Sequence, residues 1–381
     1  MILPGGDASS LAAGAQCIRA GGLLGLPTET VYGLAADADN DAAVAQIFTA
    51  KGRPADHPLI VHVADASAVD HYASEVPDFA HALMAAFWPG PLTLILPRRP
   101  GIANAAAGGN PTVGLRCPSH PVAQALLHTL LGGPEVHRGL NEGQVPVASA
   151  SSAVREKELE SDPNCSCDSI CSRVWGLAAP SANLFGRVSP TTAAHVQGEF
   201  GAALLILDGG PCSVGIESSI VDCTRGQPVL LRPGAITPRQ IEAVCGMPVR
   251  QKDALADQKA PAPKASGTLE SHYAPRARVR LMAAASLQAE LDALATSAAR
   301  VDAAQRSAPP DTAVWSRSAV RLPAGRVIGQ AMPADPAAAA QQLFATLREL
   351  DALGVSQIWV EAPPASPDWD GVRDRLQRAA H

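Results

Sequence analysis

The sequence lacks any apolar run close to the roughly 18 residues that a membrane-spanning helix needs. Its first ten residues, MILPGGDASS, also lack the basic stretch and following hydrophobic segment that mark a secretory signal. We therefore expect a soluble, cytoplasmic protein that has no membrane partner.

Basic residues are not in excess, since the formal net charge is -6 at pH 7. Lysine is especially scarce: the chain contains only Lys51, Lys157, Lys252, Lys259 and Lys264. Proteins that grip a phosphate backbone depend on dense Lys and Arg. The composition therefore argues against nucleic-acid binding as the main task, although a local basic groove remains open.

Aromatic residues make up only 4% of the chain, whereas 47% of its residues are hydrophobic. The cores must therefore be built mainly from Ala, Leu, Val and Ile. A chain of 381 residues has room for about two domains and an ample buried core.

The eight cysteines come without a secretion signal, which favours reduced thiols over a disulfide framework. Three of them form a C-x-C-x3-C cluster at Cys165, Cys167 and Cys171 that could offer thiolates to a metal. The chain has no paired C-x2-C knuckle, however, so we expect no metal site.

Short helix-like and strand-like segments alternate along residues 1–250. Apolar spacing indicates helices at 8–20, at about 41–50 and over a long stretch at about 66–87. Strand-like segments lie at 23–26, 59–63, 92–96, 113–116, 204–207, 219–223 and 229–231. This order predicts an α/β domain with a substantial sheet.

Two stretches interrupt this pattern. Residues 131–174 are small, polar and charged, which indicates a mobile surface insertion, and residues 251–275 are rich in Ala, Pro and Lys, which indicates a linker. Beyond it, residues 276–381 predict a smaller α/β domain with a parallel, Rossmann-like sheet. No G-x-G-x-x-G occurs there, so we infer no dinucleotide.

Two stretches near the N-terminus combine polar groups with restricted backbone. In PTETVYGL, at 27–34, two threonines flank a glutamate, which turn and capping chemistry alone can explain. In KGRPADHPLIVHV, at 51–63, Lys51 and Arg53 precede two prolines that restrict the loop. Such a loop can hold phosphates, with Arg offering a planar fork, or it is an ordinary solvated basic turn.

The sequence has no G-x-x-x-x-G-K-[ST], so a nucleotide would not be held by a P-loop. Later stretches place Ser, Thr, Asn or Arg beside Gly or Pro at strand edges: TVGLRCP (112–118), APSANLFGRVSP (179–190), DGGPCSVGIESSIVD (208–222) and LLRPGAIT (230–237). Taken singly, each is an ordinary turn with a capping hydroxyl.

Taken together and in order, PTETVYGL, KGRPADHPLIVH, WPGPLTLIL, VGLRCPSHPVA, APSANLFGRVSPTT, GIESSIVD and LLRPGAIT closely resemble the YrdC-type threonylcarbamoyl-AMP synthases. The resemblance covers residue 8 to about residue 248, apart from the insertion. HYAP, at 272–275, and the terminal region resemble the long, two-domain branch of that family. The resemblance implies a concave, twisted mixed sheet with helices and a smaller C-terminal Rossmann-like domain.

The resemblance also implies site residues. The residues expected to contact L-threonine are Thr30, His62, Arg116, Ala179 (through its backbone) and Ser218. Those expected to contact ATP are Arg53, His57, Thr112, Ser181, Ser189, Arg232 and Tyr273. Lys51, beside the phosphates, and Arg53 are the expected catalytic residues, and the linker at 251–275 is expected to fold as a lid over the cleft.

The family reaction condenses L-threonine, bicarbonate or CO2, and ATP to threonylcarbamoyl-adenylate and pyrophosphate, so the resemblance implies a nucleotidyltransferase. Catalysis would consist mostly of positioning and charge neutralisation, with Mg²⁺ as the companion of the triphosphate. A downstream transferase would use the product to form threonylcarbamoyladenosine in tRNA. The enzyme itself would bind tRNA weakly or not at all.

Two other functions stay open at this point. The first is an RNA-binding module, for which the abundance of Arg is the sole support. The second is a carbamoyltransferase-like enzyme that forms a carbamoyl-adenylate, as in the hydrogenase-maturation proteins that contain a related domain. Those proteins carry additional zinc-finger and acylphosphatase-like regions, and this sequence shows neither.

Overall fold

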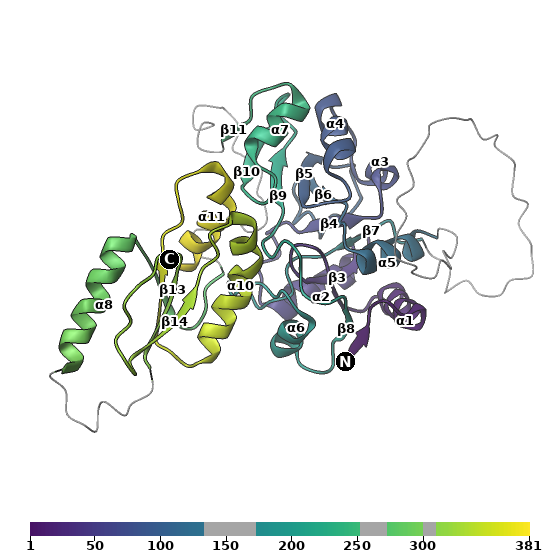
Figure 1. Cartoon of the computed structure of the whole chain (residues 1–381). Coiled ribbons are helices and arrows are strands. Elements are labelled where there is room, and N and C mark those ends of the chain that lie inside the picture. Colours follow the sequence, from purple (N-terminus) through teal and green to yellow (C-terminus); the bar gives the residue numbers. More distant parts are fainter. Residues whose placement is uncertain (133–172, 252–272, 300–309) are drawn as a thin grey trace, which may run out of the picture.

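The computed structural model describes residues 1–132, 173–251, 273–299 and 310–381 (Figure 1). The expected insertion at 131–174 and the expected linker at 251–275 therefore lie almost wholly outside the described residues. We call residues 1–251 the N-terminal unit and residues 273–381 the C-terminal unit. None of the helices in the described ranges is long and apolar enough to cross a membrane.

The N-terminal unit is built on one large mixed sheet. Its strands are β1 (Ile2–Pro4), β2 (Leu24–Leu26), β3 (Gly33–Asp37), β4 (Ile60–Val63), β5 (Leu92–Pro97), β6 (Thr112–Arg116), β7 (Gly176–Ala178), β8 (Leu205–Asp208), β9 (Ser219–Asp222), β10 (Val229–Arg232) and β11 (Arg250–Gln251). In the described ranges their order is β1-β8-β2-β3-β7-β4-β6-β5-β9-β10-β11. The sheet contains parallel pairs, such as β4 with β6, and antiparallel pairs, such as β5 with β6, which confirms the mixed α/β fold.

Helices cover both faces of this sheet. They are α1 (Ala8–Arg19), α2 (Asp41–Lys51), α3 (Val69–Tyr72), α4 (Asp78–Phe87), α5 (Pro121–Leu131), α6 (Ala193–Phe200) and α7 (Pro238–Cys245), with a 3-10 turn η1 (Ala66–Ala68). Strand β3 shows how the alternation works, because Ala35 belongs to the buried cluster that contains residues of α1 and α5, whereas Leu34 and Ala36 belong to the cluster that contains residues of α2 and α4. This period of two is what a strand buried on both faces requires.

The helix expected over 66–87 is wrong, because the structure divides it. The 3-10 turn η1 leads into α3, the chain is extended at Ala73, and α4 starts after Pro77. Proline disfavours helical conformation in the residue before it and lacks the N–H that a helix interior needs. Periodicity alone missed the break because the apolar residues on either side of it belong to the same core.

Helix α2 determines where the basic loop begins. Asn40 caps its start by accepting a hydrogen bond from the Ala43 N–H, and Gly52, at φ +62, ends it in the left-handed conformation. Glycine adopts that conformation without strain and so commonly ends helices. Lys51 is therefore the last residue of the helix rather than part of the loop, and Arg53 follows the turn.

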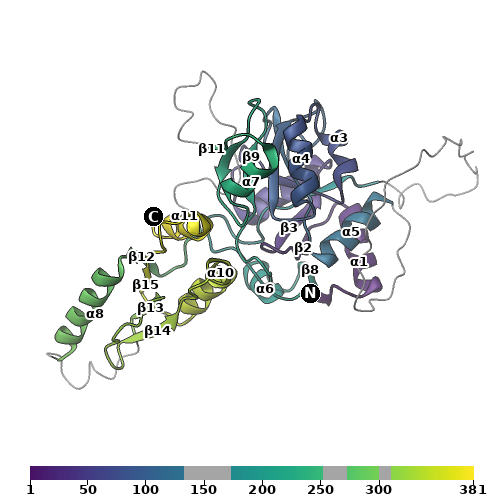
Figure 2. The ribbon, with the colours of Figure 1, turned by 45° about the horizontal axis from the view of Figure 1, so that its top comes forward.

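The C-terminal unit is a second, smaller α/β layer structure. Its elements are β12 (Arg278–Met282), α8 (Ala284–Ala299), β13 (Thr312–Ser316), β14 (Val327–Ala331), α10 (Pro336–Ala352), β15 (Gln357–Glu361), the 3-10 turn η3 (Pro367–Trp369) and α11 (Asp370–Ala379). All pairs in the sheet β12-β15-β13-β14 are parallel, which confirms the expected Rossmann-like arrangement. Helix α8 covers one face, and α10 and α11 cover the face turned toward the N-terminal unit (Figures 1 and 2).

The two units share a hydrophobic core. Val31 and Ile216 of the N-terminal unit belong to the same buried cluster as Phe344 of α10 and Val372 of α11. The units approach each other closely at Gly215, where an added Cβ would lie 2.4 Å from the backbone of Gln341 in α10. The C-terminal unit is thus packed directly against the first sheet's loops.

Replacing Gly215 tests this packing, and Gly226 provides a matched control. Both have positive φ, +78 and +69, but a Cβ on Gly226 would meet nothing within 4 Å. We expect Gly226→Ala to lower the free energy of unfolding by about 1–2 kcal/mol through backbone strain. Gly215→Ala should lose a further 1–3 kcal/mol, roughly, from overpacking. Equal losses in urea-unfolding measurements would contradict the close approach.

Candidate functional site

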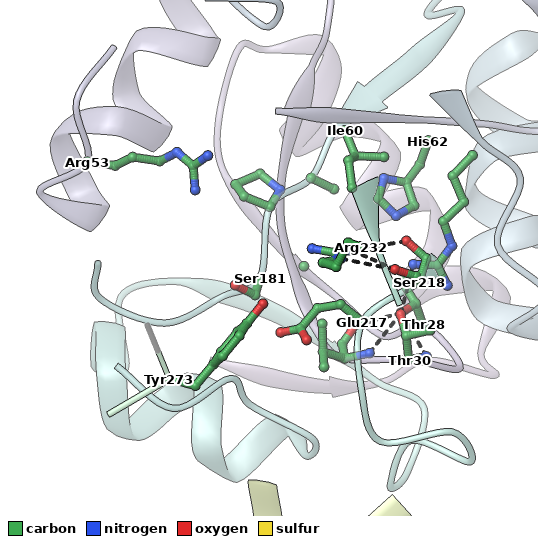
Figure 3. Close-up of a pocket in the computed structure, with 15 residues that line it drawn as sticks. Thr28, Thr30, Arg53, Ile60, His62, Ser181, Glu217, Ser218, Arg232 and Tyr273 are labelled. Carbon is green, nitrogen blue, oxygen red and sulfur yellow. Dashed lines mark hydrogen bonds between the residues drawn. The ribbon is translucent and has the colours of Figure 1, made fainter. Parts of the chain in front are cut away.

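One buried cavity gathers most of the residues that the sequence singled out. It lies where the 28–33 loop, β4, β6 and the 216–218 segment converge, and its wall includes Tyr273 (Figure 3). All five residues expected to contact threonine line it, together with Arg53, Ser181, Arg232 and Tyr273 from the expected ATP set. The cavity has a volume of about 30 Å³, which is enough to hold ordered water.

The two expected sets occupy different sides of the cavity. Figure 3 shows Arg53, Ser181 and Tyr273 on one side and His62, Ser218 and Thr30 on the other, with Arg232 and Glu217 between them. The strand register explains part of this arrangement, because His62 of β4 is paired with Arg116 of the parallel strand β6. Residues opposite each other in neighbouring strands point to the same face of a sheet.

The loop that opens with Thr28 is a hydrogen-bonded turn. The Thr28 hydroxyl accepts hydrogen bonds from the N–H groups of Thr30 and Val31, both at 3.2 Å. This is the turn chemistry that the sequence left open as one explanation. The same turn directs the Thr30 hydroxyl toward Arg116, whose Nη1 donates to it at 2.8 Å. The hydrogen bonds that form the turn therefore also place the Thr30 hydroxyl in the site.

Arg116 is buried beside a carboxylate that the sequence analysis did not single out. Its Nη2 lies 2.7 Å from Oε1 of Glu29, and both side chains are at most 6% exposed. A buried guanidinium needs such a counter-charge, since an unpaired buried ion is strongly unfavourable. The pair is close without being aligned as a hydrogen bond, so Arg116 Nη2 keeps hydrogen-bonding capacity. The signal for Glu29 was its place between the two threonines.

His62 is buried as a neutral ring. Burial, and next the nearby Arg116, lower the pKa of His62 to about 3. Its Nδ1 is buried and has no hydrogen-bond partner among the described residues. Buried polar atoms are nearly always paired, so an unpaired one in the cavity wall indicates a place for a polar ligand.

Arg232 and Ser218 form a connected pair at the centre of the site. Arg232 donates from Nε and Nη2 to the Ser218 carbonyl, at 3.0 and 2.9 Å, and from Nη2 to the Ser218 hydroxyl at 3.2 Å. With Arg53 and Arg116, Arg232 makes three guanidinium groups around one small cavity. Such a concentration of positive charge in a buried place favours an anionic ligand.

Glu217 is a second carboxylate that the sequence analysis missed. Its Oε1 accepts a hydrogen bond from the Ser189 hydroxyl at 2.5 Å, and its Oε2 accepts one from Nε of Arg375 at 2.9 Å. Burial alone would raise the pKa of Glu217, but Arg375 and Arg232 hold it below its usual value. Ser189 does not line the cavity and reaches it only through Glu217.

Lys51 lies behind the cavity rather than in its wall. Its ammonium donates to the carbonyl of Ser181 at 2.5 Å and to the carbonyl of Asn183. Burial, and then Arg53, lower the pKa of Lys51. In this arrangement Lys51 holds the loop that carries Ser181, and its burial does not fit the alternative of a solvated basic turn. Its expected catalytic role stays a prediction.

Two further residues of the expected ATP set lie outside the cavity wall. The His57 ring packs edge-on against Phe185, with 5.8 Å between ring centroids. Thr112 begins β6 and pairs with Pro97 of β5, at the opposite end of the strand from Arg116. Their expected contacts with the nucleotide stay predictions.

The described part of the chain contains no group of three or more His, Cys, Asp or Glu side chains that could hold a metal ion. The cysteine cluster at Cys165, Cys167 and Cys171 lies outside that part of the chain. The five cysteines that the structure describes are free thiols.

Family models match both units of the chain. The Sua5/YciO/YrdC model, described as "Telomere recombination", matches residues 16–234, more than half of the chain. The chain belongs to this family. A second model, described as "Threonylcarbamoyl-AMP synthase, C-terminal domain", matches residues 236–381, which places the chain in the long Sua5 form. The expected resemblance is thereby confirmed. The last strand of the first sheet ends at Gln251, and the first strand of the second sheet begins at Arg278. The domain boundaries expected at 1–250, 251–275 and 276–381 stay predictions.

Curated relatives agree with this assignment. Threonylcarbamoyl-AMP synthases of Bacillus subtilis and Pyrococcus abyssi are 40% and 39% identical over 70% and 69% of this chain. The matches span 65% and 64% of those two relatives, which is slightly less than two thirds of their length. The Schizosaccharomyces pombe threonylcarbamoyl-AMP synthase is 32% identical over 93% of this chain and 84% of its own length.

Solved structures extend the similarity to the whole Sua5 fold. A doubly substituted variant of Pyrococcus abyssi Sua5 superposes with a TM-score of 0.77 over 100% of this chain and 96% of that one, at 30% identity. The Pyrococcus abyssi Sua5 complex with L-threonine superposes with a TM-score of 0.76 over 98% of this chain and 95% of that one, also at 30% identity.

The buried neutral state of His62 predicts a pH effect on stability. The unfolded chain binds a proton at His62 below about pH 6.5, whereas the native state does not until about pH 3, so His62 makes stability fall as pH drops through that window. Between pH 6.5 and 4.5 this loss should be about 2–3 kcal/mol. Urea unfolding of His62→Gln should show a pH dependence shallower by that amount. The exposed His81→Gln is the control, and identical slopes in His62→Gln and wild type would contradict the assignment.

Proposed function

We propose that this Sua5-family chain is an L-threonylcarbamoyladenylate synthase, which condenses L-threonine, bicarbonate or CO2, and ATP to threonylcarbamoyl-AMP and pyrophosphate. The observation that supports it most is the cavity itself: the five residues expected to bind threonine surround one buried space. Three guanidinium groups in the same wall fit substrates that carry carboxylate and phosphate groups. The Pyrococcus abyssi Sua5 complex with L-threonine supports the same substrate.

Threonine would bind on the β4–β6 side of the cavity. Arg116 would face its carboxylate, because a guanidinium can donate two parallel hydrogen bonds to that group. The neutral imidazole of His62 and the hydroxyls of Thr30 and Ser218 can exchange hydrogen bonds with the substrate's polar groups. Ala179 would contribute its backbone, which is held against β4 by a hydrogen bond from its N–H to the Ile60 carbonyl at 3.0 Å.

ATP would bind on the opposite side, where Arg53 and Ser181 face the cavity, and would reach Arg232 at its centre. In the proposed reaction the threonine amine attacks CO2 and loses a proton, which gives a carbamate. A carbamate oxygen then attacks the α-phosphorus, and pyrophosphate leaves with the electrons of the broken P–O bond. The chain's part is to position the two substrates and to balance their charge, as in phosphoryl transfer generally. Lys51 would act by holding the Ser181 loop.

Magnesium does not fit as a resident ion of the described residues. Both carboxylates at the site are engaged with arginines, Glu29 with Arg116 and Glu217 with Arg375. Mg²⁺ prefers a few carboxylates together with substrate phosphates. It would therefore arrive with the triphosphate, and we assign it no protein ligand.

Tyr273 would face the nucleotide from the C-terminal side. Its side chain is fully buried and packs on Phe344 at 5.2 Å between ring centroids, and its backbone has φ +66. Bulky residues rarely adopt positive φ, and such strain persists at functional sites where packing enforces it. The proposed lid at 251–275 rests on the family resemblance, since 252–272 lie outside the described residues.

We propose further that the product passes to a downstream transferase that modifies tRNA and that the chain acts in the cytoplasm. Direct RNA binding is less well supported, because the arginines that distinguish the site are buried: Arg53, Arg116 and Arg232 are at most 8% exposed. RNA binding needs accessible cations along a surface.

Pyrophosphate release tests the proposed reaction. The protein should release pyrophosphate from ATP only when L-threonine and bicarbonate are both present, because the carbamate is the attacking nucleophile. Each component is omitted in turn, and mass spectrometry follows threonylcarbamoyl-AMP. Release that ignores the omission of threonine would refute the proposal.

Arg116→Lys tests the threonine side separately. An ammonium cannot replace the guanidinium fork, so the KM for threonine should rise about 10–100-fold while the KM for ATP changes little. Arg98→Lys is the matched control, because Arg98 is held by carbonyls of the 102–110 loop and does not line the cavity. A threonine KM that stays at the wild-type value would remove Arg116 from the substrate site.

A further inference from the structure

Arg375 of the C-terminal unit lies next to the residues that form the cavity wall. Arg375 lies in α11, the last helix of the chain, which packs against the N-terminal unit (Figures 1 and 2). Its side chain is 0% exposed, and its charge is compensated by Glu217 and Asp374. A fully buried arginine is rare unless its hydrogen bonds are satisfied.

The hydrogen bonds of Arg375 hold two segments of the N-terminal unit. Nε donates to Oε2 of Glu217 at 2.9 Å, and Nη2 donates to the Glu217 carbonyl at 3.0 Å. Nη1 donates to the Pro233 carbonyl at 2.7 Å and to Oδ2 of Asp374 at 2.8 Å. One planar, rigid group therefore sets the distance between the 217 segment and the 233 segment.

Each held residue is next to a residue of the proposed site. Pro233 follows Arg232, and Glu217 precedes Ser218, which accepts hydrogen bonds from Arg232. Glu217 itself lines the cavity and accepts a hydrogen bond from the Ser189 hydroxyl. Arg232 and Ser189 belong to the expected ATP set and Ser218 to the expected threonine set, so most of the site residues that Arg375 positions lie on the nucleotide side.

Arg375 also supports the tyrosine that closes the cavity wall. Its guanidinium carbon lies 5.8 Å from the centre of the Tyr273 ring, in the range of a cation–π contact. Phe344 of α10 also packs on this ring, with 5.2 Å between the ring centroids. Two helices of the C-terminal unit thus determine where this ring lies.

From these contacts, and resting on the proposed function, we propose that Arg375 is a positioning residue for the nucleotide side of the site. It touches neither the cavity nor the substrates. It places Glu217, Arg232 and Tyr273, so the C-terminal unit completes the ATP-binding wall instead of being an independent appendage. The N-terminal unit alone lacks this guanidinium, which is the direct ion-pair partner of Glu217.

The test compares Arg375→Lys and Arg375→Met with Arg373→Lys in the full-length chain. Arg373 lies in the same helix and is bonded within the C-terminal unit, to Asp370 and the Pro364 carbonyl. The readouts are circular dichroism, ATP binding by equilibrium dialysis, and KM and kcat for both substrates. We expect Arg375→Lys to weaken ATP binding and raise the ATP KM about 10–100-fold, because several charge-assisted bonds are lost. The threonine KM should change less than about threefold, and Arg373→Lys should match wild type.

Several results would overturn the proposal: wild-type ATP affinity in a folded Arg375→Lys protein, an equal rise in both KM values, or the same loss in Arg373→Lys. If neither Arg375 variant folds, Glu217→Gln takes their place, because its amide keeps the volume and removes the charge that faces Arg375. Unchanged ATP binding in that variant would also overturn the proposal. Failure of the wild-type chain to form threonylcarbamoyl-AMP would refute the proposed function, while dialysis with ATP would still decide the role of Arg375.

Discussion

Compensation of buried positive charge is the constraint on which the site depends. Arginines surround a cavity with little access to water, and each must find partners inside the protein because an unpaired buried ion is very costly. Arg116 is paired with Glu29, and Arg232 is held by the carbonyl of Ser218. Since these partners are themselves fixed by strands and tight turns, the positive field inside the cavity has a defined shape before any anion enters it.

The same constraint connects the two units of the chain. Glu217 is a carboxylate of the N-terminal unit whose counter-ion, Arg375, comes from the last helix of the C-terminal unit. A second ion pair between the units joins Arg348 of α10 to Glu199 of α6, at 2.8 Å. Besides the shared apolar core, the C-terminal unit therefore supplies positive charges that balance carboxylates of the N-terminal unit.

The sequence predicted those features that are local. Alternating and continuous apolar runs placed most strands within a residue of their observed bounds, and the ordered motifs, through the family resemblance, brought Thr30, His62 and Arg116 to one cavity. Short strands such as β7 gave too weak a period to be found. Glu217 and Arg375 were missed because they lie 158 positions apart, and no local pattern indicates that two distant residues will form a pair.

The backbone conformation of Tyr273, in the cavity wall, carries an energetic cost. A tyrosine at φ +66 is held there against an intrinsic backbone cost of about 1–3 kcal/mol. Any conformation in which residue 273 returns to ordinary dihedral angles recovers that energy, which corresponds to a population factor of roughly 5 to 150. The packing of Phe344 and Arg375 on the ring must therefore supply at least that much free energy to hold Tyr273 in the cavity wall.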